Sequence, residues 1–538
     1  MIGADALVKC LEEEGVTTLF GYPGVAICPF FNSILNTNIE SILVRSEQNA
    51  AHAASGYARV TGKPGVCVAT SGPGATNLIT GIATAYADSI PLICITGQVD
   101  SGLLGSDVFQ EADITGAAES FVKYSYLVKH VTDIPRIIKE AFYLANTGRK
   151  GPVLIDLPID IQNKAIRDFK YPDSINLRTY KPTVKGHSGQ IKKAAGEICK
   201  AQKPVICAGG GVLLSDAKAE LNEFAHKYNI PVVTTMMGIS VMSSSDPLYF
   251  GMVGNNGKPY ANRAMNESDL LIMVGARVAD RAISQPDLVT KNTVLIHIDI
   301  DPAEIGKNVG PTIPIVGDVK NIFEDLLKED ISCDFKEWNN TLKGYKDMCP
   351  KRKAPRAGYV DPAKFITELS SQMDDDAVYV ADVGQNQMWS CGYFTVKSGR
   401  FLTSGGMGTM GYSVPCALGV KKACPDRQVV AVCGDGSFQM SFNELGTMMQ
   451  HNIPVKIIVL SNGYLGLVRE YQANTYNKNY SVVKLSGSPD LSLISQAYGI
   501  PFVRLKDNRN IKKAVSDFLK APGPGIMECI IDPEDTVK

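Results

Sequence analysis

The feature that most constrains the fold of this chain is a regular alternation of short β-branched runs with helical segments of about 10 to 15 residues. Apolar runs such as PGVCVAT and GPVLIDLP occur early, KPVICAGGG and TVLIHIDID in the middle, and QVVAVCGDG and VKIIVLSNG late in the chain. Strands that alternate with helices form βαβ units and parallel sheets. The sequence therefore predicts an α/β fold of doubly wound parallel sheets.

The predicted sheets fall into three domains. A chain of 538 residues is too long for one hydrophobic core. Two polar stretches interrupt the alternation, DFKYPDSINLRTYKPTVKGHSG and KGYKDMCPKRKAPRAGYVDP. We therefore expect domains at residues 1–165, 186–345 and 358–538.

The composition excludes several classes of protein. The formal net charge is −1, so we expect no basic face for nucleic acid. The chain has neither an export-type leader nor an apolar run of membrane-spanning length, which predicts a cytoplasmic protein without membrane contact. Its 13 cysteines lack a C-x-x-C pair, which favours reduced core thiols over disulfides or zinc sites.

Two strand ends in the last third predict a metal site. The strand predicted in QVVAVCGDG ends at Gly434-Asp435-Gly436, and the one predicted in VKIIVLSNG ends at Ser461-Asn462, with a helical segment between them. A right-handed crossover makes the strands parallel, so both side chains reach one edge of the sheet. A carboxylate, an amide oxygen and a loop carbonyl are ligands that Mg²⁺ accepts. Gly434 and Gly436 allow the backbone to approach an anion, so we expect a metal-bridged diphosphate here.

A lone acid and a lone base stand at other strand ends. Glu47, in RSEQNAAHA, lies between a predicted strand and a predicted helix, where the simplest role of an acid is to interact with the helix dipole. Arg281, in GARVADRAI, follows an apolar strand. Its guanidinium could clamp a 2-keto acid carboxylate, contact a flavin phosphate, or be an ordinary surface group. The loop TSGPGATN lacks a Walker lysine, which excludes a nucleoside triphosphate site.

The spacing of GDG and the later Asn resembles the thiamin diphosphate motif. With it, the chain from about residue 3 onward resembles the catalytic subunits of the acetolactate (acetohydroxyacid) synthase family. The matching stretches include FGYPG, EQNAAHAASGYAR, TSGPGATNL, DVFQE, GPVLIDLP, MVGARVADR, HIDIDPAEIGKN and SGGMGTMGYSVP. The resemblance implies that the domains bind, in order, the aminopyrimidine ring of thiamin diphosphate, an FAD without redox role, and the diphosphate with Mg²⁺. It also implies that two subunits build each active site, in a homodimer or larger oligomer, and that a regulatory small subunit is a further partner.

The resemblance assigns site residues by position. Glu47 would hydrogen-bond the aminopyrimidine ring, Met410 would bend the cofactor, and the Gly408 carbonyl would hold its amino group. The magnesium ligands would be Asp435, Asn462 and the Tyr464 carbonyl. The thiamin diphosphate positions are Gly24, Glu47, Gln110, Gln385, Asn386, Gly408, Thr409, Met410, Gly436, Ser437, Asn462, Tyr464, Leu465, Gly466 and Leu467. Those expected for FAD, or assigned to cofactor binding with them, are Ser89, Arg149, Gly210, Thr235, Met236, Gly254, Asn256, Gly275, Arg277, Asp280, Arg281, Asp299, Ile300, Asp318, Val319, Gly405 and Gly406. The expected catalytic and substrate-pocket positions are Glu47, Phe109, Gln110, Lys123, Arg281 and Tyr471.

Several positions depart from the family pattern. Ser46 replaces the usual His before the catalytic Glu, Val25 replaces a glycine, and Ile159 replaces a lysine near the active-site entrance. Asn255 and Asn256 stand in the flavin segment and Asn386 in the diphosphate segment, where the family has other residues. Tyr471 aligns with a tryptophan that favours 2-ketobutyrate as the second substrate. The cofactor set is therefore retained while the acceptor pocket is altered.

The resemblance implies acetolactate synthesis, in which pyruvate is decarboxylated on thiamin diphosphate and the remaining two-carbon unit is joined to a second 2-keto acid. That second acid would be pyruvate or 2-ketobutyrate, in the first step of branched-chain amino acid biosynthesis. The nearest alternative is another thiamin-dependent decarboxylase or carboligase with a changed acceptor. A non-catalytic flavin- or nucleotide-binding protein is a second alternative, disfavoured because Glu47, Asp435 and Asn462 are retained. A simple dinucleotide-dependent dehydrogenase is disfavoured because no early G-x-G-x-x-G follows a strand.

Overall fold

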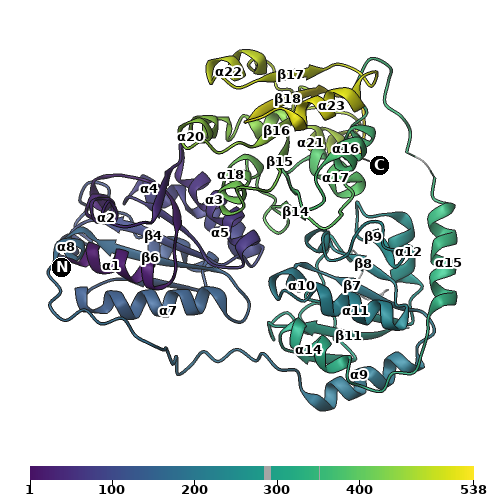
Figure 1. The fold of residues 1–538 in the computed structure, drawn as a ribbon, viewed down its shortest axis with the longest axis horizontal. Helices are drawn as coiled ribbons and strands as arrows, with labels where there is room; N and C mark the ends of the chain where they lie inside the picture. The colour runs from purple at the N-terminus through teal and green to yellow at the C-terminus, as the bar shows by residue number, and fades with distance from the viewer. Residues whose placement is uncertain (284–292, 351, 538) are drawn as a thin grey trace.

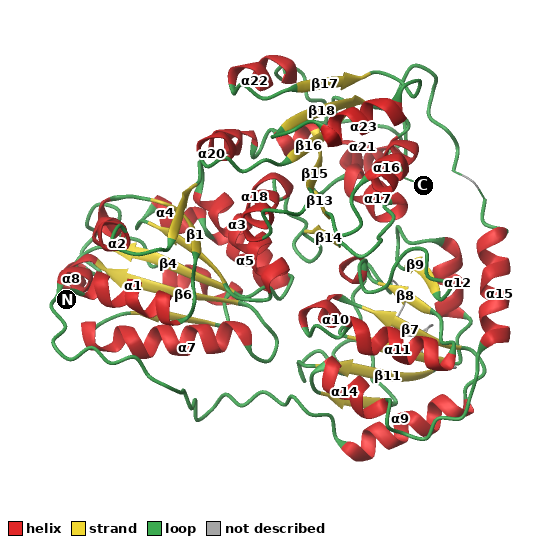
Figure 2. Ribbon diagram, in the orientation of Figure 1, coloured by secondary structure: helices red, strands yellow, loops and turns green. Residues whose placement is uncertain are grey.

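The computed structural model describes residues 1–283, 293–350 and 352–537, and within them the chain forms three six-stranded parallel sheets. Each sheet lies in its own third of the chain, and helices surround it (Figures 1 and 2). The predicted α/β fold with doubly wound parallel sheets is confirmed. No helix of the described residues is both long enough and apolar enough to cross a bilayer.

The first sheet has the strand order β2-β1-β3-β4-β6-β5. Its strands are β1 (Thr18–Tyr22), β2 (Glu40–Leu43), β3 (Gly65–Ala69), β4 (Leu92–Gln98), β5 (Tyr124–Leu127) and β6 (Pro152–Pro158). The accompanying α-helices are α1 (Gly3–Glu13), α2 (Cys28–Ile34), α3 (Glu47–Thr61), α4 (Pro73–Asn77), α5 (Ile79–Ala87), α6 (Ile114–Ala118), α7 (Ile134–Asn146) and α8 (Ile159–Asn163).

The third sheet repeats this topology, with the order β14-β13-β15-β16-β18-β17. Its strands are β13 (Val378–Ala381), β14 (Arg400–Thr403), β15 (Val429–Gly434), β16 (Lys456–Ser461), β17 (Phe502–Leu505) and β18 (Gly525–Ile530). Its α-helices are α16 (Pro362–Gln372), α17 (Gln385–Tyr393), α18 (Ser413–Ala423), α19 (Asp435–Phe438), α20 (Leu445–Gln450), α21 (Gly466–Thr475), α22 (Leu491–Ala497) and α23 (Ile511–Lys520).

The middle sheet has a different order, β9-β8-β7-β10-β11-β12. This is the 3-2-1-4-5-6 order of dinucleotide-binding domains, which bind ligands where the order reverses, here between β7 and β10. Its strands are β7 (Pro204–Ala208), β8 (Val232–Thr234), β9 (Tyr249–Met252), β10 (Leu270–Val274), β11 (Val294–Asp299) and β12 (Ile313–Val316). Its α-helices are α9 (Ser188–Lys200), α10 (Gly210–Leu214), α11 (Lys218–Tyr228), α12 (Pro259–Asn266), α14 (Val319–Leu326) and α15 (Lys336–Asp347).

The first and third sheets share one hydrophobic core. Cys67 and Ala69 of β3 belong to the same buried cluster as Ala431 and Cys433 of β15. The outward-facing residues of these strands belong to separate clusters, as the two-residue repeat of a doubly covered sheet requires. Helices α3 and α18 lie side by side within the shared core (Figure 1). A β-carbon on Gly419 would lie 1.8 Å from the carbonyl oxygen of Ala53, so only glycine permits this close packing.

A buried carboxyl on β6 predicts a pH-dependent stability. Asp156 accepts hydrogen bonds from Thr96 Oγ1 (2.7 Å) and Gln98 Nε2 (2.9 Å), yet burial raises its pKa to about 7. The folded chain therefore binds more protons than the unfolded chain between about pH 4 and 7, and this carboxyl lowers stability as the pH rises through that window. At pH 8 we expect Asp156→Asn to have a higher free energy of unfolding than the wild type, by at most about 4 kcal/mol, and therefore to melt at a higher temperature. Scanning fluorimetry should show that this advantage shrinks at pH 5, and an equal difference at both pH values would contradict the assignment.

Candidate active site

The carboxyl-terminal edge of the first sheet gathers Glu47 with a glycine-rich turn. Glu47 is the first residue of α3, and its Oε2 accepts a hydrogen bond from Asn77 Nδ2 at 3.0 Å. A β-carbon on Gly74 would lie 3.4 Å from Glu47 Oε1, and one on Gly24 would lie 2.5 Å from the Thr70 side chain. The glycines thus keep this edge open beside a half-buried carboxylate.

The segment after β4 brings a second predicted residue to the same edge. Gln110 has a φ of 60°, and a β-carbon on Gly72 would lie 2.9 Å from its carbonyl oxygen. The neighbouring Phe109 points away from the protein, with 89% of its surface exposed. The structure therefore brings Gly24, Glu47 and Gln110 together and leaves Phe109 uncovered.

The corresponding edge of the third sheet gathers the predicted magnesium ligands. The buried Asp435 accepts hydrogen bonds from the backbone N–H of Gly436 (3.0 Å) and of Gly463 (2.7 Å), next to Asn462. Asn462 Oδ1 accepts from the N–H of Tyr464 at 2.9 Å. Burial raises the pKa of Asp435 to about 6, against the effect of these N–H donors. A divalent cation at this carboxylate would favour its charged form.

The residues around Asp435 fit a diphosphate and its metal. Asn386 Oδ1 is buried without a hydrogen-bond partner, which is the state expected of a group that binds a ligand. A β-carbon on Gly436 would lie 3.0 Å from Leu465 and 3.6 Å from Met410, so the glycine leaves a cradle between them. Gln385 Oε1 accepts from Asn462 Nδ2 at 3.1 Å. Among the described residues, no group of three His, Cys, Asp or Glu side chains could hold a metal ion.

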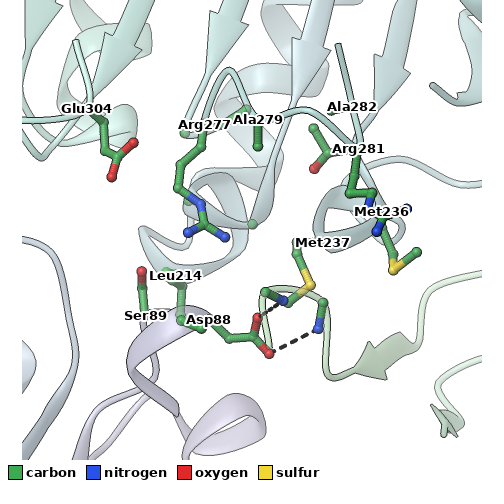
Figure 3. Close-up of a pocket in the computed structure, with 18 of the residues that line it drawn as sticks. Asp88, Ser89, Leu214, Met236, Met237, Arg277, Ala279, Arg281, Ala282 and Glu304 are labelled. Atoms are coloured by element: carbon green, nitrogen blue, oxygen red, sulfur yellow. Dashed lines mark hydrogen bonds between the residues drawn. The ribbon is translucent and has the colours of Figure 1, made fainter. Parts of the chain in front are cut away.

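A pocket of about 740 Å³ lies at the switch point of the middle sheet, between all three domains (Figure 3). Its size lies within the range of roughly 300 to 1,000 Å³ typical of cofactor pockets. Every predicted flavin position except Gly254 lines it. Gly211 and Gly275 meet at the base, where a β-carbon on Gly211 would lie 2.6 Å from the Gly275 Cα.

Charged side chains line this pocket on two sides. Arg149 donates to Ser89 Oγ (3.0 Å), Asp301 (3.2 Å) and Glu304 (2.7 Å), which ties the first domain to the middle one. Burial raises the pKa of Asp299 to about 6. Arg277 also faces the pocket (Figure 3). Guanidinium groups, carboxylates and close-packed glycines suit a dinucleotide with its pyrophosphate and ribose hydroxyls.

Comparison with known proteins agrees with this geometry. Three thiamine pyrophosphate enzyme models match the chain: the N-terminal TPP binding domain at residues 1–117, the central domain at 191–326, and the C-terminal TPP binding domain at 382–529. A probable acetolactate synthase large subunit from Methanococcus aeolicus is 43% identical over 557 residues, covering 100% of this chain and 93% of the relative. The chain belongs to the acetolactate synthase large-subunit family of thiamine pyrophosphate enzymes.

Other relatives extend across bacteria. The acetolactate synthase large subunit of Corynebacterium glutamicum is 44% identical over 531 residues, covering 96% of this chain and 84% of the relative. An acetolactate synthase of Arthrospira platensis is 43% identical over 542 residues, covering 98% of this chain and 93% of the relative. The chain is thus a thiamine pyrophosphate-dependent enzyme of the acetolactate synthase type, with thiamine pyrophosphate-binding domains at both ends.

Three of the predicted substrate-pocket residues, Lys123, Arg281 and Tyr471, lie in different surroundings. Lys123 is turned into the first domain, where its ammonium donates to the carbonyl oxygens of Leu144 and Thr147 and to Tyr180 Oη. Burial lowers the pKa of Lys123 to about 8. Arg281 lines the pocket with 84% of its side chain exposed, and Tyr471 on α21 is 58% exposed. Lys123 caps the end of α7, and no cavity residue contacts its ammonium among the described hydrogen bonds.

Sequence reasoning missed several residues that line the pocket: Asp88, Lys150, Met237, Glu304 and Gln387. Asp88 and Lys150 directly neighbour the predicted Ser89 and Arg149, so their positions carried a signal. Glu304 stands within the matching stretch HIDIDPAEIGKN. Met237 and Gln387 likewise neighbour the predicted Met236 and Asn386, although Asn386 was assigned to the diphosphate and not to this pocket.

Proposed function

We propose that this chain is the catalytic subunit of an acetolactate synthase, which decarboxylates pyruvate and joins the two-carbon unit to pyruvate or 2-ketobutyrate, as the first step of branched-chain amino acid biosynthesis. The observation that carries the proposal is that two half-sites, one around Glu47 and one around Asp435, are retained in a chain 43% identical to acetolactate synthase large subunits over its full length. We assign residues 1–165 to the aminopyrimidine, 186–345 to FAD and 358–538 to the diphosphate.

The chain's own residues would hold the cofactor and move one proton. Asp435, Asn462 and the Tyr464 carbonyl would bind Mg²⁺, while Gln385, Asn386 and the glycine cradle at Gly436 would face the diphosphate. Thiamin diphosphate, when bound, supplies the electron sink for decarboxylation. Glu47 would share a proton with a ring nitrogen of the aminopyrimidine and fix its orientation.

The two half-sites favour a homodimer. The described hydrogen bonds of the Glu47 carboxylate stay within its own domain, to Asn77. Apolar side chains stand exposed beside both edges, Val25 (77%) and Phe109 (89%) at the first and Met440 (58%) at the third. Helix α21 contains no buried residue. We propose that a second copy covers these surfaces, so that Glu47 of one subunit completes the thiamin diphosphate site that Asp435 anchors in the other.

FAD and a small subunit complete the proposed assembly. The 740 Å³ pocket at the switch point would take FAD as a structural group without a redox role. Most of the relatives are named large subunits, so we propose that a regulatory small subunit binds this chain as well. Arg281, exposed at the pocket rim, would clamp the carboxylate of the 2-keto acid.

Product analysis tests the function. Purified protein with pyruvate, Mg²⁺, FAD and thiamin diphosphate should form acetolactate and carbon dioxide in equal amounts. A panel of 2-keto acids separates this function from that of another thiamin-dependent decarboxylase or carboligase. An aldehyde or a different acyloin in place of acetolactate would overturn the proposal.

The choice of acceptor should depend on Tyr471. With both pyruvate and 2-ketobutyrate present, we expect Tyr471→Trp to raise the share of the 2-ketobutyrate product about three- to tenfold, since one more methylene buried against a larger ring is worth roughly 1 kcal/mol. Tyr476, whose ring lies 5.9 Å from that of Tyr471 and is similarly exposed, provides the control variant Tyr476→Trp, which should leave the ratio unchanged. Equal product ratios for both variants would show that Tyr471 does not line the acceptor pocket.

A further inference from the structure

A buried ion pair lies where the first domain meets the third. Arg59 of α3 donates to Asp88, at the end of α5, at 2.6 Å, and their side chains are 6% and 0% exposed. The same carboxylate accepts the backbone N–H groups of Gly406 (2.7 Å) and Gly405 (3.3 Å), drawn as dashed lines in Figure 3. Asp88 thus links a helix of the first domain to a loop of the third.

That loop, residues 404–413, is fixed at its other end by a second buried carboxylate. Asp382 accepts the N–H groups of Gly411 (2.9 Å) and Ser413 (2.7 Å). Between the two carboxylates, Thr409 Oγ1 lies 2.7 Å from Thr84 Oγ1 of α5. The 404–413 loop is therefore held from both domains at once.

The 404–413 loop faces two ligand sites. Residues 404–408 line the 740 Å³ pocket proposed for FAD. Met410, expected to bend thiamin diphosphate, lies 3.6 Å from the position of a β-carbon on Gly436 in the diphosphate cradle. A shift of residues 404–408 in the pocket therefore also moves Met410 beside the diphosphate cradle.

We propose that Asp88 is a positioning residue that couples the two cofactor sites, because its bonds to Gly405 and Gly406 hold the loop where both FAD and thiamin diphosphate bind. The inference rests on the proposed function, since it needs both cofactors. Charge-assisted bonds to two successive N–H groups are strong enough to fix a glycine-rich segment. Coupling between the sites must be reciprocal: each cofactor tightens the other by the same factor.

Two variants separate positioning from folding. Asp88→Asn removes the charge but leaves Arg59 buried without its partner, which destabilises the fold. Gly406→Ala changes neither Arg59 nor Asp88, so the ion pair stays intact. The new β-carbon would lie 2.8 Å from the carbonyl oxygen of Ala87, and this clash would push the loop away from Asp88. If Asp88→Asn does not fold, Gly406→Ala decides the question.

The experiment is a titration of thiamin diphosphate by calorimetry in saturating Mg²⁺, with and without saturating FAD. In the wild type, FAD should lower the Kd of thiamin diphosphate at least about fivefold, the lower end of typical coupling. In Asp88→Asn and Gly406→Ala, the ratio of the two Kd values should fall below about two. The reverse titration, FAD with and without thiamin diphosphate, should give the same ratios.

Asp269→Asn is the matched control. Its carboxylate also accepts two successive N–H groups, those of Gln202 (2.7 Å) and Lys203 (2.8 Å), and it does not line the pocket, so the wild-type ratio should persist. Coupling of wild-type size in both loop variants would overturn the positioning role. A wild type that binds both cofactors without coupling would overturn this inference alone, whereas one that binds neither would overturn the proposed function with it.

Discussion

Glu47→Gln should lose about 10²- to 10⁴-fold in the rate of acetolactate formation, the range typical of a lost proton-transfer group. Glutamine keeps the size of the side chain and can still pair with Asn77, whose Nδ2 donates to Glu47 at 3.0 Å. It cannot share a proton with a ring nitrogen. We therefore expect turnover to fall while thiamin diphosphate still binds, with steady-state kinetics and calorimetry on the same preparation as the measurements.

The competing role of Glu47 is a favourable interaction with the N-terminus of α3, worth less than about 1 kcal/mol at an exposed site. Glu337 provides a control, because it is an exposed acid in the first turn of α15. Glu337→Gln should change the melting temperature about as much as Glu47→Gln and leave the rate unchanged. Near-normal turnover in Glu47→Gln would reduce Glu47 to that helix-terminal role.

The parts of this molecule that follow from local patterns could be predicted. Alternating strands and helices require parallel sheets, and a right-handed crossover must bring the ends of β15 and β16 to one edge. In the structure these strands pair in parallel, and the N–H of Gly463 donates to Asp435 at 2.7 Å, next to Asn462. Most of the predicted flavin positions share one pocket because they follow strands of the middle sheet, whereas Ser89, Arg149, Gly405 and Gly406 reach it from the other two domains.

The contacts between domains could not be predicted in this way. Asp88 stands more than 300 positions from Gly405 and Gly406, and no periodicity in YADSIP indicates a partner there. The family resemblance predicts Lys123 in the substrate pocket, yet carbonyls at the end of α7 bind its ammonium. The first outcome depends on how the domains pack together and the second on packing within the first domain, and a local pattern specifies neither.

Asp435→Asn should weaken binding of Mg²⁺ and thiamin diphosphate together, by at least about 100-fold, and abolish turnover. The neutral amide is a poor ligand for a hard cation. It also cannot accept from both N–H groups that now reach the two carboxylate oxygens, those of Gly436 and Gly463, so one N–H group loses its partner.

Calorimetry should show the loss of affinity. In melting curves, Mg²⁺ and thiamin diphosphate together should stabilise the wild type but not the variant. Asp490→Asn is the control, because asparagine can keep the N-cap of α22 and the ion pair that is lost, with Arg504, lies at the surface. Since a cofactor without its metal anchor cannot be held against Glu47, retained ligand-dependent stabilisation in Asp435→Asn would overturn the placement of magnesium at this sheet edge.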